Sequence, residues 1–170
     1  MSKRPPGWTN DILELFRKNR DKIDTTRGLQ KKSDEVLSII RPDLTNIKFT
    51  VEKGKRNEDK IIRPVLFGEM GVFAHKYDID AFREDDGIML EVEAGRAIKG
   101  NAIYRDLIHM SLMVDAKYAV IAMPLSYKHK GAKSALVEVA SYETGKRLLE
   151  AIFASQRLTL PFDGILLIGY

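Results

Sequence analysis

The chain has 170 residues, of which 44% are hydrophobic and 31% charged, a composition typical of one globular domain with its own core. It has no cysteine, which excludes disulfides, thiolate zinc sites and cysteine nucleophiles. The formal net charge of +4 permits binding to phosphate but is too small to argue for it alone.

No run of 18 apolar residues is present, so we expect no membrane span. The basic N-terminus lacks the apolar segment of a secretory signal. Together with the missing cysteines, this predicts a cytoplasmic protein.

The first forty residues predict two helices. Thr9 is the expected N-cap of the first helix, and Ser33 is the expected N-cap of the second, which Pro42 should end. Residues 47–51 alternate like a short strand, and the charged run 52–60 predicts a loop. Apolar runs around residue 70 indicate one or two further strands.

The second half of the chain has a clearer pattern. Segments 77–82 and 88–93 alternate with period two, and Asp86-Gly87 between them is typical of a two-residue hairpin turn. The remaining elements are a helix opened by Asn101, a buried strand at 118–123, a helix at about 142–155 and a last buried strand at 164–168. This order predicts an α/β fold with three layers and a mixed central sheet flanked by helices.

The predicted hairpin carries carboxylates on one face. With Asp86 and Gly87 as the central turn residues, Asp80 lies opposite Glu93 and diagonal to Glu91. Phe82 lies opposite Glu91. The other face is expected to be the buried one, because its side chains are all apolar: Ile79, Ala81, Ile88, Leu90 and Val92.

Opposed Cβ atoms lie roughly 5 Å apart, so Asp80, Glu91 and Glu93 converge on one point. Like charges so arranged repel, and basic side chains or a bound cation must offset the repulsion. Mg²⁺ favours such oxygen ligands and assists phosphodiester hydrolysis. The alternative is an ordinary solvated strand face, whose glutamates pair with Lys76, Arg96 or Lys99.

At these residues the sequence resembles the PD-(D/E)xK nuclease superfamily, which has the restriction-endonuclease-like fold. Its signature is an aspartate on one strand followed by Glu/Asp-x-Lys on the next. Here Tyr77-Asp-Ile-Asp-Ala-Phe82 supplies Asp80, and Leu90-Glu-Val-Glu93 supplies Glu91 and Glu93. Glu93 stands where lysine is usual, which is similar to the BamHI-type restriction enzymes, as is Tyr104-Arg-Asp-Leu107 downstream.

The resemblance implies a metal-dependent endonuclease that hydrolyses phosphodiester bonds in double-stranded DNA, in restriction or defence. It implies Mg²⁺ as cofactor, with Mn²⁺ as a substitute, and a homodimer that cuts both strands. Asp80 and Glu91 would be metal ligands, and Glu93 a ligand or the general base. Glu69 is the expected upstream acidic ligand, with Glu14 and Glu35 as rivals.

Basic residues near the motif and in the segment 127–133 are the candidates for contacts with nucleic acid. They are Arg96, Lys99, Arg105, Lys128, Lys130 and Lys133. The same segment is equally typical of a solubilising surface loop, and Arg105 with His109 also fits an ordinary wet helix face.

Two other functions stay open. Without the lysine, no obvious ammonium stabilises the pentavalent phosphate, which motivates a catalytically degenerate nucleic-acid-binding module of the same fold. The third hypothesis is an interaction protein with an acidic sheet face and no nucleic-acid role. The three histidines lack metal-ligand spacing, and no glycine-rich nucleotide-binding pattern supports nucleotide or nicotinamide chemistry.

Overall fold

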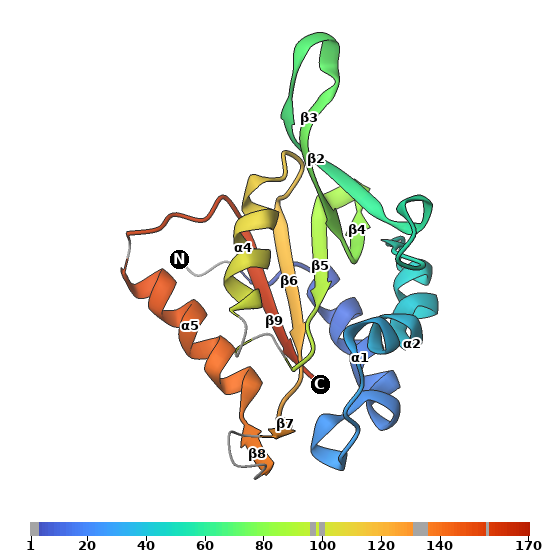
Figure 1. The fold of residues 1–170 in the computed structure, drawn as a ribbon, viewed down its shortest axis with the longest axis vertical. Helices are drawn as coiled ribbons and strands as arrows, with labels where there is room; N and C mark the ends of the chain where they lie inside the picture. The colour runs from blue at the N-terminus through green and yellow to red at the C-terminus, as the bar shows by residue number, and fades with distance from the viewer. Residues whose placement is uncertain (1–3, 96–97, 99–100, 131–135, 156) are drawn as a thin grey trace.

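The computed structural model describes residues 4–95, 98, 101–130, 136–155 and 157–170. Its central sheet lies between two pairs of helices (Figure 1). α1 (Trp8–Ile23) and α2 (Ser33–Asn46) cover one face, and α4 (Ala102–Leu112) and α5 (Ser141–Ser155) cover the other. The predicted α/β class is confirmed.

The central sheet has five strands, in the order β1 (Thr50–Val51), β4 (Ala81–Arg83), β5 (Ile88–Val92), β6 (Tyr118–Met123) and β9 (Gly164–Gly169). β4 is antiparallel to both β1 and β5, whereas β6 is parallel to both β5 and β9. The parallel pairs follow from the helices α4 and α5, which carry the chain back across the sheet. The predicted mixed sheet is therefore confirmed.

Both faces of the sheet are buried, whereas we expected burial only on the face of Ala81 and Leu90. Those two residues belong to a core with α1 and α2. Phe82 and Met89, on the acidic face, are only 3% and 0% exposed, because α4 and α5 pack over them in a second core. Helices α4 and α5 thus cover the acidic face as well.

The first predicted hairpin strand is broken at Asp80. β3 (Phe73–Ile79) ends just before this residue and β4 begins just after it. The bend restarts the alternation of side chains, so Ile79 packs in the second core with Phe82 rather than sharing a face with Ala81. The prediction for Ile79 was therefore wrong.

The hairpin turn is longer than the predicted two residues. Residues Glu84–Asp86 form a 3₁₀ turn, which Gly87 closes with φ of 64°. The register pairs Phe82 with Met89 rather than with Glu91. This shift of two residues leaves the side chains of β4 and β5 on their predicted faces, because side chains alternate with period two.

The ends of the N-terminal helices differ from prediction. Gly7, not Thr9, is the N-cap of α1, and the Thr9 hydroxyl donates to the carbonyl of Pro6 at 2.6 Å. Pro42 lies inside α2, which continues to Asn46 because the fully buried Leu44 anchors its last turn in the core. The longer helix reduces the predicted strand 47–51 to Thr50–Val51.

Two hairpins lie outside the central sheet. β2 (Ile61–Phe67) pairs with β3 and stands out from the body (Figure 1). β7 (Tyr127–Lys130) pairs with β8 (Leu136–Val139). The segment 127–133 was predicted as a loop, but its first four residues form a strand.

The helices and strands of the second half match their predicted positions closely. Asn101 is the N-cap of α4, as expected. Helix α4 ends at Leu112, and Val114, just beyond it, is 56% exposed. In the part of the chain that the structure describes, no helix is long and apolar enough to cross a membrane.

Candidate functional site

Asp80 occupies the break between β3 and β4, where its backbone and side chain both tie neighbouring strands together. Its Oδ2 accepts a hydrogen bond from the backbone N–H of Val92 at 2.8 Å. Its carbonyl accepts one from the N–H of Glu52 at 2.8 Å. The bend is thus satisfied by hydrogen bonds and directs the carboxyl toward β5.

Glu91, on β5, lies beside Asp80, and the two carboxyl groups are close enough to interact directly. Burial raises the pKa of Asp80 to about 6. Burial and the neighbouring Asp80 raise the pKa of Glu91 well above its usual value. Because two carboxylates in contact repel, the pair is stable only with a shared proton or a nearby cation.

Glu93 forms a second carboxyl pair, with Asp106 of α4. Burial and a hydrogen bond to Asp106 raise the pKa of Glu93 to about 9. Asp106 Oδ1 accepts two bonds from the Arg105 guanidinium, at 3.0 and 2.9 Å. Its Oδ2 is buried without a donor, so a protonated Glu93 would satisfy it.

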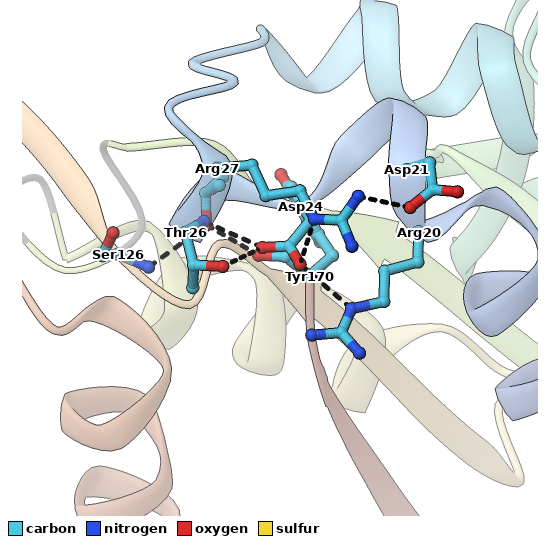
Figure 2. Close-up of polar contacts among 8 residues, drawn as sticks. Arg20, Asp21, Asp24, Thr26, Arg27, Ser126 and Tyr170 are labelled. Carbon is cyan, nitrogen blue, oxygen red and sulfur yellow. Dashed lines mark hydrogen bonds and ion pairs between the residues drawn. The ribbon is translucent and has the colours of Figure 1, made fainter.

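The backbone of Glu93 is held by distant parts of the chain. Its N–H donates to the carbonyl of Ala122 at 2.7 Å, and its carbonyl accepts a hydrogen bond from the Tyr170 hydroxyl. The Tyr170 carbonyl accepts in turn from the Thr25 hydroxyl at 2.8 Å. Next to this contact, the buried Asp24 accepts from Thr26 N–H and forms ion pairs with arginines of the same segment (Figure 2).

The Asp80–Glu91 pair opens into two spaces. A cavity of about 350 Å³ is lined by polar side chains and Ile79: Glu52, Asp78, Asp80, Glu91, Arg105, Asp106 and His109. Burial and the charge of Asp80 raise the pKa of Glu52. His109 stacks on Tyr77, with ring centroids 3.9 Å apart. This acidic cavity therefore gathers carboxylates from β3, β5 and α4, together with Glu52 just after β1 and Asp80 between β3 and β4.

The second space is a cleft of about 790 Å³ that reaches the same carboxyl pair and also Glu93. Its rim carries lysines from separate segments: Lys31, Lys32, Lys55 and Lys128. Lys55 pairs with Asp34 at 2.8 Å. The backbone N–H of Lys128 donates to the side chain of Gln30 at 3.4 Å. This hydrogen bond links β7 to the segment just before α2 at the edge of the cleft. Carboxylates thus lie at the floor and lysines at the edge.

All three predicted catalytic carboxylates line the cleft, and Asp80 and Glu91 also share the smaller cavity. Asp80 contacts Glu91, whereas the predicted Asp80–Glu93 opposition was wrong because of the shifted register. Glu69 lies in the turn at the tip of the β2–β3 hairpin and lines neither space. Of its rivals, Glu14 pairs with Arg17 on the exposed face of α1.

Glu35, the other rival, accepts a hydrogen bond from the Lys32 N–H at the start of α2 and does not line either space. Among the predicted nucleic-acid contacts, Arg105 lines both spaces and Lys128 lines the cleft. The remaining predicted contacts, Arg96, Lys99, Lys133 and the side chain of Lys130, lie outside the described residues.

Sequence reasoning missed Glu52, Asp106 and the lysines of the N-terminal segment. Asp106 directly follows Arg105, a predicted nucleic-acid contact, in the helix after the motif. That position next to a candidate site residue was a usable signal. Glu52 directly follows the predicted strand at 47–51. However, only the pairing of β1 with β4 brings Glu52 next to Asp80, and local patterning does not contain that pairing.

The donor set suits a hard cation. In the described part of the chain, no three His, Asp or Glu side chains stand ready in a metal-binding arrangement. Mg²⁺ needs no such cluster, because it takes one or two protein carboxylates and completes its shell with water and substrate oxygens. Asp80 and Glu91 provide that pair, and Glu52 lines the same cavity.

Comparison with models of known protein families, with curated proteins and with solved structures finds no match. The fold and the site define an α/β domain with a mixed five-stranded sheet and a carboxylate cluster where β3 of the outer hairpin leads into β4 of that sheet.

Proposed function

We propose that this chain is a metal-dependent endonuclease with a restriction-endonuclease-like fold, which hydrolyses phosphodiester bonds in DNA. The observation that carries the proposal is the Asp80–Glu91 pair. Two carboxyl groups with raised pKa values lie in contact at the floor of an open cleft with a lysine rim. Such a pair favours a cation on one side, and the rim favours a polyanion on the other.

Asp80 and Glu91 would hold Mg²⁺ or Mn²⁺, and Glu52 is a better candidate for the additional acidic ligand than Glu69. When bound, the cation would polarise the phosphodiester, favour ionisation of a water molecule and stabilise the leaving oxygen. The hydrogen bond from Val92 N–H keeps Asp80 oriented in the absence of any ligand.

Glu93 is the candidate general base. To accept a proton it must first be ionised, and the charge of Arg105 lowers its pKa against the opposing effect of burial. Positive charge added beside Asp80 would act in the same direction. Glu93 would then orient a water molecule from a backbone position fixed by Ala122 and Tyr170.

Arg105 can take the electrostatic role of the missing lysine. It lines both spaces, and Asp106 holds its guanidinium by two hydrogen bonds. Its side chain is 62% exposed, which leaves donors free to contact a phosphate. Arg105 would thus supply the positive charge that the lysine of the family motif supplies and that Glu93 does not.

The test is cleavage of supercoiled and linear DNA in Mg²⁺, in Mn²⁺ and in EDTA. We expect metal-dependent cleavage by the wild-type chain. Glu91→Gln, which removes one ligand charge while keeping the shape, should reduce the rate at least about 100-fold. Glu150→Gln, on the exposed side of α5, is the matched control and should cleave normally. Equal rates for wild type and Glu91→Gln would disprove the proposal.

A catalytically degenerate nucleic-acid-binding module is the second candidate. One observation favours it: Glu93 stands at the position where the nuclease family that the sequence resembles has lysine. In that case DNA binding measured by fluorescence anisotropy in EDTA should persist and weaken with salt, while no metal supports cleavage. Absence of both cleavage and salt-dependent binding would instead favour an interaction protein without a nucleic-acid role.

A further inference from the structure

An aromatic ring stands in the lysine-rimmed cleft, beside its carboxylates. Tyr127, the first residue of β7, lines the cleft together with Glu93 and Gly95. β7 follows β6 and lies beyond the end of the central sheet (Figure 1). A Cβ added at Gly95 would overlap the Tyr127 ring, so the ring rests directly on the backbone there. Because Gly95 is two residues from Glu93, the ring borders the carboxylate floor of the cleft.

The Tyr127 ring is held in place but is not buried. It stacks on the ring of His129, two residues along the same strand, with centroids 5.9 Å apart and an angle of 12° between the planes. The pairing of β7 with β8 sets Tyr127 opposite Val139. Tyr127 is nevertheless only half-buried. Because it also lines the cleft, part of its surface is available to a planar group inside the cleft.

Positive charge lies on both sides of this ring. Lys128 follows Tyr127 directly and is exposed, and Lys31 and Lys32 line the same cleft from the segment before α2. These lysines attract phosphates whatever the base sequence. Lysines for the backbone and an aromatic ring for the bases are the two features that bind single-stranded nucleic acid without sequence preference.

The size of the cleft also favours one strand over two. Its volume of about 790 Å³ lies in the range of small-ligand sites, about 300–1,000 Å³. Glu93, at its floor, is only 9% exposed, so a phosphodiester must enter the cleft to reach it. A short segment of one strand fits such a space, whereas a double helix stays at the rim. A base inside a duplex is moreover paired and stacked, and must leave the helix before it can stack on a side chain.

We propose that the cleft binds DNA as an unpaired strand, with one base stacked on Tyr127 and the backbone beside that base reaching the carboxylate floor. Lys31, Lys32 and Lys128 would hold the neighbouring phosphates. The substrate is then single-stranded DNA, or an unpaired segment at the end of a duplex, in place of the intact duplex that the family resemblance implies. The cleavage of this strand rests on the proposed nuclease function, whereas its binding does not.

The test compares one labelled DNA strand, alone and annealed to its complement, by fluorescence anisotropy. The strand has about 20 nucleotides, which is longer than the usual single-strand site. Ca²⁺ replaces Mg²⁺, because it binds carboxylate oxygens with the same charge. We expect wild type to bind the unpaired strand at least about 5-fold more tightly than the duplex, as the gain of one base stack requires.

Tyr127→Ala should weaken binding of the unpaired strand at least about 5-fold and leave duplex binding unchanged. Tyr127→Phe keeps the ring and should bind like wild type. Phe153→Ala is the matched control, because it removes an exposed aromatic ring (59%) on α5, outside the cleft. A 2-aminopurine in the strand gives a second readout. Its fluorescence should be quenched by wild type and Tyr127→Phe but not by Tyr127→Ala.

Equal affinity of wild type for the strand and the duplex would overturn the proposal, even if Tyr127→Ala fails to fold, which circular dichroism checks. So would a folded Tyr127→Ala protein that binds the unpaired strand as tightly as wild type. Tighter binding of the same strand made of RNA would overturn the assignment to DNA.

Cleavage of the same strand and duplex in Mg²⁺ separates this proposal from the proposed nuclease function. Strand binding through Tyr127 without any cleavage would contradict the nuclease and support the single-strand cleft. Mg²⁺-dependent cleavage of the intact duplex, at the same rate in Tyr127→Ala as in wild type, would support the nuclease and contradict the single-strand cleft.

Discussion

Glu93 connects the electrostatics of the site to the stability of the fold. Its pKa is raised to about 9 by burial and by the hydrogen bond to Asp106, against an ordinary value of 4.5. A group whose pKa is higher in the folded state than in the unfolded state stabilises the fold fully below its unfolded pKa. That contribution is lost as the pH rises from about 4.5 through about 9. The metal-free protein should therefore lose stability toward alkaline pH.

Glu93→Gln should remove this loss, because an amide stays neutral and can still donate to Asp106 Oδ2. In EDTA at pH 8 we expect its melting temperature to exceed that of wild type by roughly 2–6 °C, which corresponds to about 1–2 kcal/mol. At pH 5 the difference should be small. Thermal melts of both proteins across this pH range measure it, with Glu150→Gln as control. A Glu93→Gln protein destabilised equally at both pH values would contradict the assigned protonation.

At the level of single residues, the sequence predicted the carboxylates of the hairpin but not their partners. Asp80 and Glu91 were expected to meet, and they do. Asp106 was passed over because an acidic residue on an amphipathic helix is ordinary. Only the packing of α4 on the sheet brings its carboxyl to Glu93.

At the scale of elements, the β4–β5 turn sets the register that brings Asp80 to Glu91. Gly87 closes this turn at a φ of 64°, and a Cβ there would lie 2.5 Å from the backbone carbonyl oxygen of Asp115. Both the conformation and the close approach exclude a side chain.

Gly87→Ala should therefore lower the free energy of unfolding by roughly 2–4 kcal/mol. Gly7→Ala is the matched control, because its added Cβ would meet no atom within 4 Å and its φ is ordinary. Urea unfolding followed by circular dichroism measures both. Equal midpoints for Gly87→Ala and wild type would show that the turn adopts another conformation.

The predicted end of α2 and the predicted continuous strand through Asp80 were both wrong, and for the same reason. Local rules end a helix at Pro42 and keep a strand continuous through Asp80. Tertiary contacts override both rules: buried Leu44 holds the last turn of α2, and hydrogen bonds from Glu52 and Val92 satisfy the bend.

At the scale of the whole molecule, ligand binding and folding are linked. If Asp80 and Glu91 hold a cation only in the folded state, Mg²⁺ stabilises the fold by about 1.4 kcal/mol at a concentration of about ten times its dissociation constant. We expect a rise in melting temperature of roughly 3–6 °C at pH 8.

The rise should be absent in Glu91→Gln and present in Glu150→Gln. Differential scanning calorimetry with and without Mg²⁺, at constant ionic strength, measures it. An equal rise in all three proteins would indicate a general salt effect and not a site at this pair.

By itself, the sequence determined the α/β class, most helices and strands, and the face on which Asp80 and Glu91 lie. These features depend on local periodicity, and a register shift of two residues leaves the faces of β4 and β5 unchanged. Only the tertiary structure decided which residues surround the pair. The pairing of β1 with β4, the packing of α4 and the approach of the N-terminal lysines join segments far apart in the chain. Such contacts form because the whole core buries apolar surface together, which no local pattern records.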